Sequence, residues 1–344
     1  MSPGNRVDPV SGPGAGGPAR RPVPTGWRLW LAGARPRTLP AAVVPVLVGT
    51  AAAAGVVHAS AGSGWFMTGP NTGVLYSTEV VSGLKGLIVW RALAAMVVAL
   101  FIQIGTNFAN DYSDGIKGTD NETRVGPIRL VGSGLKAPSA VKKAALGSFG
   151  VAALAGLALA AATTWWLLPV GLVCFAAGWL YTGGPKPYGY YGFGELFVFV
   201  FFGLVATLGS TFVQLERVTW LSLGCGAAVG ALATALLVIN NLRDIPTDTV
   251  AGKRTLAVRL GDKRTRILYV VLMVVPYLLL PLIVGLGERP YGLMAYAALF
   301  VAQRPVLLVL QGAKGADLIP VLGRTGRVQL VFGVLLAAGL FISA

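Results

Sequence analysis

The chain has 344 residues, of which 55% are hydrophobic and only 12% charged, and its mean hydropathy is +0.70. This composition excludes an ordinary soluble domain and predicts a membrane protein with several spans. A formal net charge of +15 would be compatible with nucleic-acid binding in a soluble protein. Because the basic residues here lie between apolar runs, we interpret them as topology determinants and anion ligands, and we expect no nucleic-acid partner.

The N-terminal segment 1–26 is rich in proline, glycine and arginine and shows no hydrophobic periodicity. We expect it to be a disordered cytoplasmic tail. The next stretch, 27–39, combines tryptophans with arginines, which is typical of a segment that lies at the lipid headgroups. Residues 27–344 are then predicted to form a single transmembrane domain.

Nine apolar runs follow, and each is long enough to cross a bilayer as a helix. They are predicted at 39–57, 89–110, 144–162, 165–181, 194–212, 221–240, 267–285, 291–310 and 328–343. The predicted fold class is therefore all-α, with nine transmembrane helices. Because nine is an odd number, the two termini are expected on opposite sides of the membrane.

The distribution of basic residues predicts the orientation of the bundle. Of the 28 lysines and arginines, 23 fall in the N-terminal tail and in loops on the same side, four fall on the opposite side, and Arg304 lies inside a span. The positive-inside rule then places the N-terminus in the cytoplasm and the C-terminus outside. We expect a multi-pass protein of the plasma membrane, surrounded by membrane lipids.

Two acidic clusters end apolar runs on the predicted cytoplasmic side. The first reads N-F-A-N-D-Y-S-D-G-I-K-G-T-D over 107–120, and the second reads N-N-L-R-D-I-P-T-D over 240–248. Helical spacing puts three members of each cluster on roughly one face, namely Asn107, Asp111 and Asp114, and Asn240, Asp244 and Asp248. Asp120 lies beyond two glycines, where a loop is expected. Carboxylates at the end of a membrane segment are costly, so both clusters are functional-site hypotheses.

The two clusters together predict a cation site. Five aspartates in one low-dielectric mouth would repel one another in the absence of cations. Asp and Asn oxygens, with no histidine or cysteine nearby, suit Mg²⁺, for which Mn²⁺ often substitutes. The candidate metal ligands are Asn107, Asp111, Asp114, Asp120, Asn240, Asp244 and Asp248, and two ions are expected.

Basic loops after each cluster provide the complementary half of an anion site. The candidate diphosphate ligands are Lys117, Arg124, Arg129, Lys253 and Arg254. Cations beside carboxylates at the edge of a lipid phase describe a pocket for a diphosphate with a hydrophobic tail. Metal and guanidinium groups there would stabilise a departing diphosphate, so Asp111, Asp114, Lys117, Asp244 and Asp248 are the candidate catalytic residues. For any single basic residue of these loops, a role in membrane topology alone is the alternative interpretation.

The loop 181–195 reads Y-T-G-G-P-K-P-Y-G-Y-Y-G-F-G-E and holds more aromatic residues than a turn requires. We interpret Tyr181, Lys186 and Tyr188 as candidates for a wall that contacts an aromatic substrate. The alternative, that this is a structural loop at the membrane surface, remains equally open.

The two aspartate motifs resemble those of the UbiA-type intramembrane prenyltransferases. N-D-Y-S-D-G-I-K-G-T-D, R-V-G-P-I-R-L-V-G-S-G and the opening A-R-P-R-T-L-P-A-A-V-V-P are similar to the 1,4-dihydroxy-2-naphthoate polyprenyltransferases. The resemblance extends from about residue 27 to the C-terminus. Two positions depart from the general superfamily pattern: Gly118 stands where an aspartate is expected, and Pro246 interrupts the second motif, where the helix is expected to end early.

The resemblance implies a nine-helix bundle around a central cavity that opens to the cytoplasm and the lipid. It also implies a reaction, in which Mg²⁺ and the aspartates bind a polyprenyl diphosphate and ionisation gives an allylic cation. The ring of 1,4-dihydroxy-2-naphthoate attacks this cation, and loss of CO₂ yields demethylmenaquinol. Arg35 or Arg37 is the candidate ligand of the aromatic carboxylate, although topology also accounts for both.

Two alternatives remain at the level of sequence. One is a UbiA-type enzyme that acts on another acceptor, such as 4-hydroxybenzoate or a sugar phosphate. The other is a cation-coupled transporter that uses the acidic faces as an ion path. Transporters usually place such groups near the bilayer midplane on broken helices, whereas both clusters here lie at the ends of spans beside basic loops.

Overall fold

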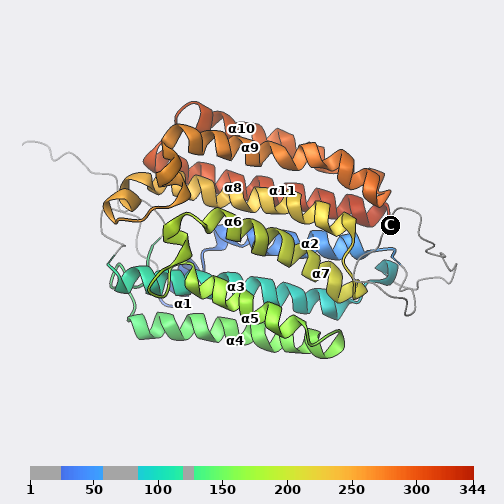
Figure 1. Ribbon diagram of the computed structural model, residues 1–344, viewed down its shortest axis with the longest axis horizontal. Helices are drawn as coiled ribbons and strands as arrows, with labels where there is room; N and C mark the ends of the chain where they lie inside the picture. The colour runs from blue at the N-terminus through green and yellow to red at the C-terminus, as the bar shows by residue number, and fades with distance from the viewer. Residues whose placement is uncertain (1–24, 57–83, 119–127) are drawn as a thin grey trace, which may run out of the picture.

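The computed structural model describes residues 25–56, 84–118 and 128–344, and this part of the chain is helical without β-strands (Figure 1). The α-helices are α1 (Trp27–Ala34), α2 (Pro40–Ala53), α3 (Val89–Ile116), α4 (Pro138–Ala162), α5 (Leu167–Leu180), α6 (Gly194–Val198), α7 (Ala206–Leu215), α8 (Trp220–Val250), α9 (Leu256–Gly287), α10 (Leu299–Leu310) and α11 (Leu318–Ile342). Short helical turns are η1 (Pro36–Thr38), η2 (Leu84–Gly86), η3 (Tyr188–Tyr191), η5 (Pro290–Ala298) and η6 (Gly315–Asp317), and η4 (Phe199–Val205) is a π-helix.

The all-helical membrane fold is confirmed. Within the described residues, seven helices are long and apolar enough to cross a membrane, and eight if α1–η1 and α2 count as one bent span. The run expected at 165–181 forms α5, whose 14 residues are short for a span. A count of nine spans therefore stays a prediction. The expected tail lies almost wholly outside the described residues.

The chain enters the bundle through a sharp bend. Helix α1 ends at Ala34; the next residue, Arg35, adopts a left-handed conformation with φ of 55°, and Pro36 follows. Proline lacks the N–H needed to extend a helix, so the direction changes here. The axis of the α1–η1 segment is bent 55° from that of α2. The stretch expected at the headgroups is thus a separate short helix set at an angle to the first span.

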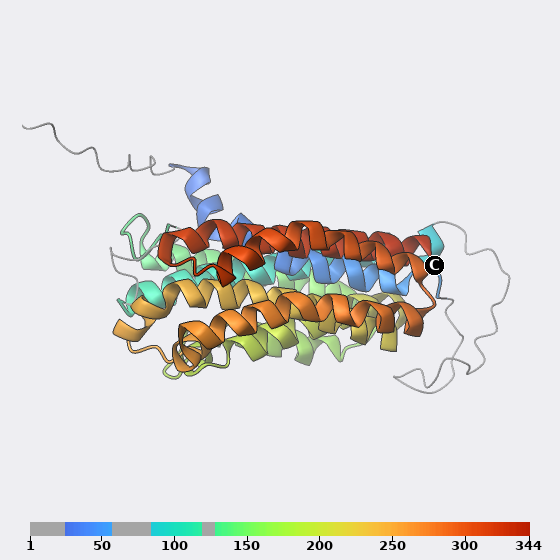
Figure 2. The same ribbon diagram turned by 90° about the horizontal axis from the view of Figure 1, so that it is seen from above.

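The long helices form two groups with α2 and the α6–α7 segment between them (Figures 1 and 2). One group holds α3, α4 and α5, and the other holds α8, α9, α10 and α11. Helix α8 is the most buried span and contributes much of the main hydrophobic core. The ends of α3 and α8 that carry the acidic clusters lie at the same end of the bundle.

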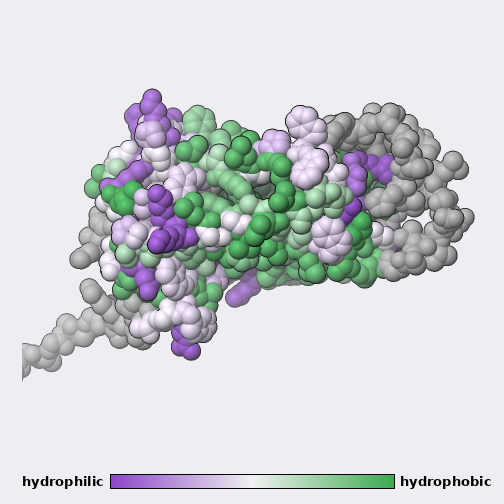
Figure 3. All heavy atoms as spheres, turned by 90° about the horizontal axis from the view of Figure 1, so that it is seen from below, coloured by the Kyte–Doolittle hydropathy of each residue, from purple (hydrophilic) through white to green (hydrophobic). Residues whose placement is uncertain are grey.

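The α6–α7 segment contacts α8 unusually closely. A Cβ on Gly203 would lie 2.4 Å from the Cα of Gly230, so only glycine fits at this crossing. Gly203 belongs to the π-helical turn η4, and such turns often mark functional sites. Figure 3 shows a hydrophobic belt around the middle of one face, a hollow within that belt and hydrophilic residues gathered at the end that carries the acidic clusters.

Candidate active site

A cavity of about 1200 Å³ runs between the two groups of helices. Its deep part is apolar and is lined from α3, α5, η4 and α7, by residues that include Val98, Ile102, Leu168, Phe201 and Val213. Its polar end is lined by the C-terminal parts of α3 and α8 and by the loops that follow them. One cavity thus joins a charged mouth to a hydrophobic interior, which matches an amphiphilic ligand.

Asp114 is the charged centre of the α3 end and is 3% exposed. Its Oδ1 accepts a hydrogen bond from the Tyr190 hydroxyl at 2.6 Å and lies 3.2 Å from the Lys253 ammonium. Its Oδ2 lies 3.3 Å from the Arg129 guanidinium. These partners come from three different loops, so a single carboxylate brings distant segments to the mouth of the cavity.

Asp111 is placed differently from the expectation that it faces the same cavity. It is completely buried, and its two oxygens accept hydrogen bonds from the backbone N–H groups of Leu130 and Val131 at 2.8 and 3.0 Å. It does not line the cavity. The helical spacing was right, but the side chain faces the loop that carries Arg129. Asp111 therefore holds the backbone next to Arg129, which lines the cavity, without lining the cavity itself.

The α8 end is neutralised by its own sequence. The Arg243 guanidinium donates two hydrogen bonds to the Asp244 carboxylate, at 2.7 and 2.8 Å, and a third to Asn240 Oδ1 at 2.9 Å. Helix α8 was expected to end early at Pro246. That expectation is wrong, because the helix continues to Val250. The Thr247 hydroxyl donates to the backbone carbonyl of Asp244 at 3.0 Å. Because α8 continues past Pro246, Asp248 lies on the same helix as Asp244 and lines the cavity.

Repulsion among the aspartates was expected in the absence of cations, and the structure places protein cations beside two of them. Asp114 lies between two cations, and Asp244 carries a two-point guanidinium contact. All three cations are at most 9% exposed. Buried charges need partners because desolvation is costly. The carboxylates and the cations of the mouth therefore form one mixed network.

The lysines and the tyrosine-rich loop meet at Tyr190. The ammonium groups of Lys253 and Lys117 lie 4.5 and 5.2 Å from the centre of the Tyr190 ring, within cation–π range. Lys117 also donates to the backbone carbonyls of Thr182 and Gly184 at 2.7 and 3.1 Å. Its side chain holds the aromatic loop against the end of α3. Tyr190 was not singled out from the sequence, although the excess of tyrosines in its loop was.

A row of rings forms one wall of the cavity. The ring of Tyr188 stacks on Phe197 at 4.0 Å between centroids and meets Tyr181 edge-on at 5.5 Å. Phe197 continues the row to Phe201 at 5.7 Å. The Tyr188 hydroxyl donates to the Ala177 carbonyl at 2.8 Å, and burial raises the pKa of this phenol above its usual value. Tyr188 therefore stays protonated and supplies a surface rather than a base.

The structure brings most of the predicted site residues to one cavity. Those that line it are Arg35, Arg37, Asn107, Asp114, Arg129, Tyr181, Tyr188, Asn240, Asp244, Asp248 and Lys253. The four described candidates that do not line it are Asp111, Lys117, Lys186 and Arg254. Asp120 and Arg124 lie outside the described residues.

Three cavity-lining residues of the acidic motifs, Asn110, Asn241 and Arg243, were missed by the sequence analysis. Asn110, which is 7% exposed, accepts a hydrogen bond from the Thr182 hydroxyl at 2.8 Å. Arg243 lies between Asn240 and Asp244 on α8. Their positions inside the motifs N-D-Y-S-D and N-N-L-R-D were visible in the sequence. The sequence did not show which face of each helix would line the cavity.

The oxygen donors at the mouth fit a hard divalent cation. Asn110, Asp114, Asn240, Asp244 and Asp248 all line the polar end of the cavity. Carboxylate and amide oxygens are the ligands that Mg²⁺ prefers. Over residues 25–56, 84–118 and 128–344, no three carboxylate, histidine or cysteine side chains gather closely enough to hold an ion by themselves. The donor chemistry fits Mg²⁺, which normally keeps several other ligands such as water and phosphate.

Comparison with known proteins decides the family. Residues 42–317 match the UbiA prenyltransferase family. The chain belongs to this family. A protein of Mycobacterium tuberculosis called 1,4-dihydroxy-2-naphthoate octaprenyltransferase is 48% identical over 90% of this chain and 96% of its own length. A Bacillus subtilis protein with the same description is 32% identical over 90% and 91% of the two chains.

The fold is also similar to that of solved UbiA homologues. One from Archaeoglobus fulgidus, bound to GPP and Mg²⁺, superposes with a TM-score of 0.55 over 90% of this chain and 99% of its own. Its sequence identity to this chain is 12%. At that identity the likeness supports the UbiA fold for this chain.

Proposed function

We propose that this membrane protein transfers a polyprenyl chain from polyprenyl diphosphate to 1,4-dihydroxy-2-naphthoate, with loss of CO₂ and diphosphate, to give demethylmenaquinol for menaquinone synthesis. A relative called 1,4-dihydroxy-2-naphthoate octaprenyltransferase is 48% identical over nine-tenths of the chain. The observation that carries the proposal is the cavity, since one end gathers buried cations and carboxylates and the other is apolar. An isoprenoid diphosphate has the same two halves.

The mouth of the cavity binds the diphosphate. Asp114, Asp244 and Asp248, with Asn110 and Asn240, would hold Mg²⁺, which when bound neutralises diphosphate charge and favours its departure. The solved homologue bound to GPP and Mg²⁺ supports a site for an isoprenoid diphosphate and Mg²⁺ in this fold. The basic groups already held at the mouth, Arg129, Lys253 and Arg243, lie where they can bind phosphate oxygens in place of carboxylates.

The aromatic acceptor binds deeper, against the row of rings. Arg35 or Arg37, which both line the cavity, binds its carboxylate. The allylic C–O bond breaks, and its electron pair leaves with the diphosphate. The ring carbon that bears the carboxylate then attacks the allylic cation. Cleavage of the bond to the carboxylate releases CO₂ and returns an electron pair to the ring, which restores its aromaticity.

The orientation follows from charge. The polar mouth faces the cytoplasm, the N-terminus is cytoplasmic and the C-terminus lies outside the plasma membrane, in agreement with the positive-inside rule. The apolar part of the cavity then holds the prenyl tail at the depth of the acyl chains. An ion path would not need an apolar cavity of this size, so membership in the prenyltransferase family and the cavity both favour transfer over transport.

The decisive experiment incubates purified protein with a labelled polyprenyl diphosphate and one of three acceptors: 1,4-dihydroxy-2-naphthoate, 4-hydroxybenzoate or a sugar phosphate. We expect prenylated product and an equal amount of CO₂ with the naphthoate alone. Exhaustive EDTA treatment should abolish turnover and added Mg²⁺ should restore it. Transfer to another acceptor in preference to the naphthoate would contradict the assignment, and full turnover after EDTA would contradict the metal requirement.

A further inference from the structure

Gln103 stands one helical turn before Asn107 in the middle of an otherwise apolar stretch of α3. It lines the cavity and is only 7% exposed. Eleven residues separate it from Asp114, which is roughly 16 Å along a helix axis. Gln103 therefore lies well inside the cavity, away from the charged mouth. A buried amide at this depth needs partners for both its nitrogen and its oxygen.

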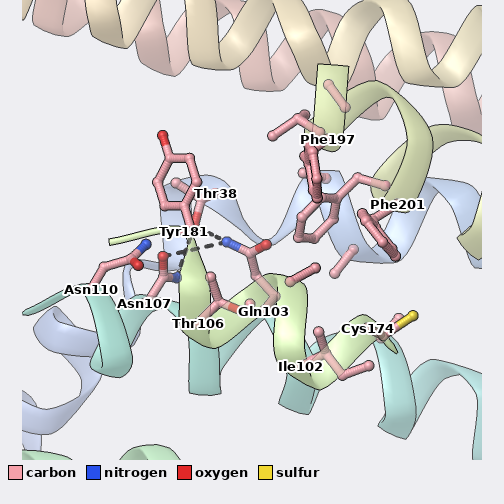
Figure 4. A pocket seen from close by; sticks show the side chains of 18 of the residues that line it. Thr38, Ile102, Gln103, Thr106, Asn107, Asn110, Cys174, Tyr181, Phe197 and Phe201 are labelled. Atoms are coloured by element: carbon pink, nitrogen blue, oxygen red, sulfur yellow. Dashed lines mark hydrogen bonds between the residues drawn. The ribbon is translucent and has the colours of Figure 1, made fainter. Parts of the chain in front are cut away.

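The amide nitrogen of Gln103 is fully used within the protein. Its Nε2 donates to the Thr38 hydroxyl oxygen at 3.1 Å and to Asn107 Oδ1 at 3.4 Å. An amide nitrogen carries two hydrogens, so both are engaged. Figure 4 shows the Gln103 nitrogen turned toward Thr38 and Asn107, and its oxygen on the opposite side.

The orientation of this amide is fixed by a backbone carbonyl. Asn107 Nδ2 donates to the Ala34 carbonyl at 2.9 Å. A carbonyl can only accept, so the Asn107 amide must present its nitrogen to Ala34 and its oxygen to Gln103. The Gln103 amide must then present its nitrogen to Asn107. The assignment of nitrogen and oxygen in both side chains thus follows from the Ala34 carbonyl.

The remaining donors of the network are also used. Asn107 Nδ2 directs its second hydrogen at the Thr38 hydroxyl oxygen at 3.2 Å, and the Thr38 hydroxyl donates to the Arg35 carbonyl at 3.0 Å. No donor in the network is left for the cavity. Gln103 Oε1 accepts no hydrogen bond from the described residues. The network therefore offers the cavity one fixed acceptor.

The chemistry of the ligands decides which of them this acceptor fits. A diphosphate bound to metal has no hydrogen to donate, and a prenyl tail has no polar atom. The aromatic acceptor has two hydroxyls. The hydroxyl next to the carboxylate donates internally to that carboxylate, which leaves the 4-hydroxyl as a free donor. A fixed acceptor in the cavity matches this group.

We propose that Gln103 Oε1 accepts a hydrogen bond from the 4-hydroxyl of the naphthoate, and that Gln103 is the specificity-determining residue for hydroxyl donors on the aromatic acceptor. The inference rests on the proposed function. The network that orients Gln103 also fixes the turn of Arg35, a candidate ligand of the carboxylate. Two recognition elements for one substrate thus share a single scaffold.

The test compares acceptors with wild-type protein first. The compounds are 1,4-dihydroxy-2-naphthoate, 1-hydroxy-2-naphthoate, its 4-methoxy derivative and its 4-amino derivative. A buried acceptor left without a donor should lower kcat/KM by roughly 10- to 100-fold. We expect this loss with the 4-hydrogen and 4-methoxy compounds, and retention of most activity with the 4-amino compound, which keeps a donor. Equal use of the 4-hydrogen and 4-hydroxy compounds would overturn the proposal.

A variant localises the effect. Gln103→Met removes the acceptor, so discrimination between the 4-hydroxy and 4-hydrogen compounds should fall to within about threefold, while KM for polyprenyl diphosphate stays the same. Gln329→Met is the matched control, because Gln329 is fully buried on α11 and does not line the cavity. It should discriminate like wild type. If Gln103→Met retains discrimination, the hydroxyl is recognised elsewhere.

The two proposals fail in distinguishable ways. Absence of any transfer to 1,4-dihydroxy-2-naphthoate by wild-type protein contradicts the proposed function. Transfer without discrimination at the 4-position contradicts only the role of Gln103. If Gln103→Met fails to fold, the ranking of the four acceptors by the wild-type protein still decides, since only a donor at the 4-position is predicted to restore activity.

Discussion

The two acidic helix ends look alike in sequence but are built differently. On α3, Asp114 is neutralised by Arg129 and Lys253, which lie 15 and 139 residues away. On α8, Asp244 is neutralised by its immediate neighbour Arg243. The α3 end therefore depends on the tertiary fold for its charge balance, whereas the α8 end brings its own counter-ion.

Within the α3 motif, a residue that lines the cavity can also be told apart from one that supports a loop. Asp111 and Asp114 belong to the same motif, but only Asp114 lines the cavity, whereas Asp111 binds the backbone of the loop that carries Arg129. A motif of aspartates at helical spacing thus contains at least two kinds of residue. Substitutions that preserve volume and remove charge can distinguish them.

The largest effect is expected at Asp114. Asp114→Asn keeps the size of the side chain and removes the charge that organises Arg129 and Lys253. Loss of one electrostatic group at a reacting centre costs roughly 10² to 10³ in rate, and we expect kcat/KM to fall by that range. Steady-state kinetics with saturating Mg²⁺ measures it. Near-normal turnover would show that the α3 end is not part of the reacting centre.

Asp111→Asn should act on stability. One of its two backbone partners would face an amide nitrogen instead of an oxygen. Hydrogen bonds to charged groups contribute about 1.5–3 kcal/mol each, so the free energy of unfolding should fall by about that amount. Thermal unfolding in detergent, with and without Mg²⁺, checks this prediction. An unchanged Tm together with lost Mg²⁺ affinity would instead place Asp111 among the metal ligands.

The smallest effect is expected at Tyr190. Tyr190→Phe removes the hydroxyl that donates to Asp114 at 2.6 Å but keeps the ring beside Lys117 and Lys253. We expect KM for polyprenyl diphosphate to rise roughly tenfold, with a small change in kcat, because one charge-assisted hydrogen bond is lost. Tyr191→Phe, in the same turn and outside the cavity lining, is the control. Equal effects of both changes would argue against a specific role for Tyr190.

The sequence predicted the helices more reliably than their functional faces. Apolar runs located α3 and α8, and α3 continues past the apolar run predicted at 89–110 and ends at Ile116, close to the glycines where a loop was expected. Helical spacing correctly put Asp111 and Asp114 on one helix. Their different partners depend on where the chain folds back 15 to 20 residues later, which periodicity does not encode.

Two further features of the site were beyond the sequence for similar reasons. The contact between Lys253 and Asp114 joins two loops that follow different helices, so it exists only in the assembled bundle. Gln103 was not singled out from the sequence, because one amide within an apolar run hardly alters the hydropathy of the span. Its significance comes from the orientation that Asn107 and the Ala34 carbonyl impose.

The central claim is that the ends of α3 and α8 form one metal and diphosphate site. The most direct measurement is a double-mutant cycle on Mg²⁺-dependent binding of a polyprenyl diphosphate by calorimetry. It uses wild-type protein, Asp114→Asn, Asp244→Asn and the double variant. If the two carboxylates act as one unit, each single change should remove most of the affinity and the double variant should lose little more. Losses that simply add, or single variants that bind as tightly as wild type, would contradict a shared site.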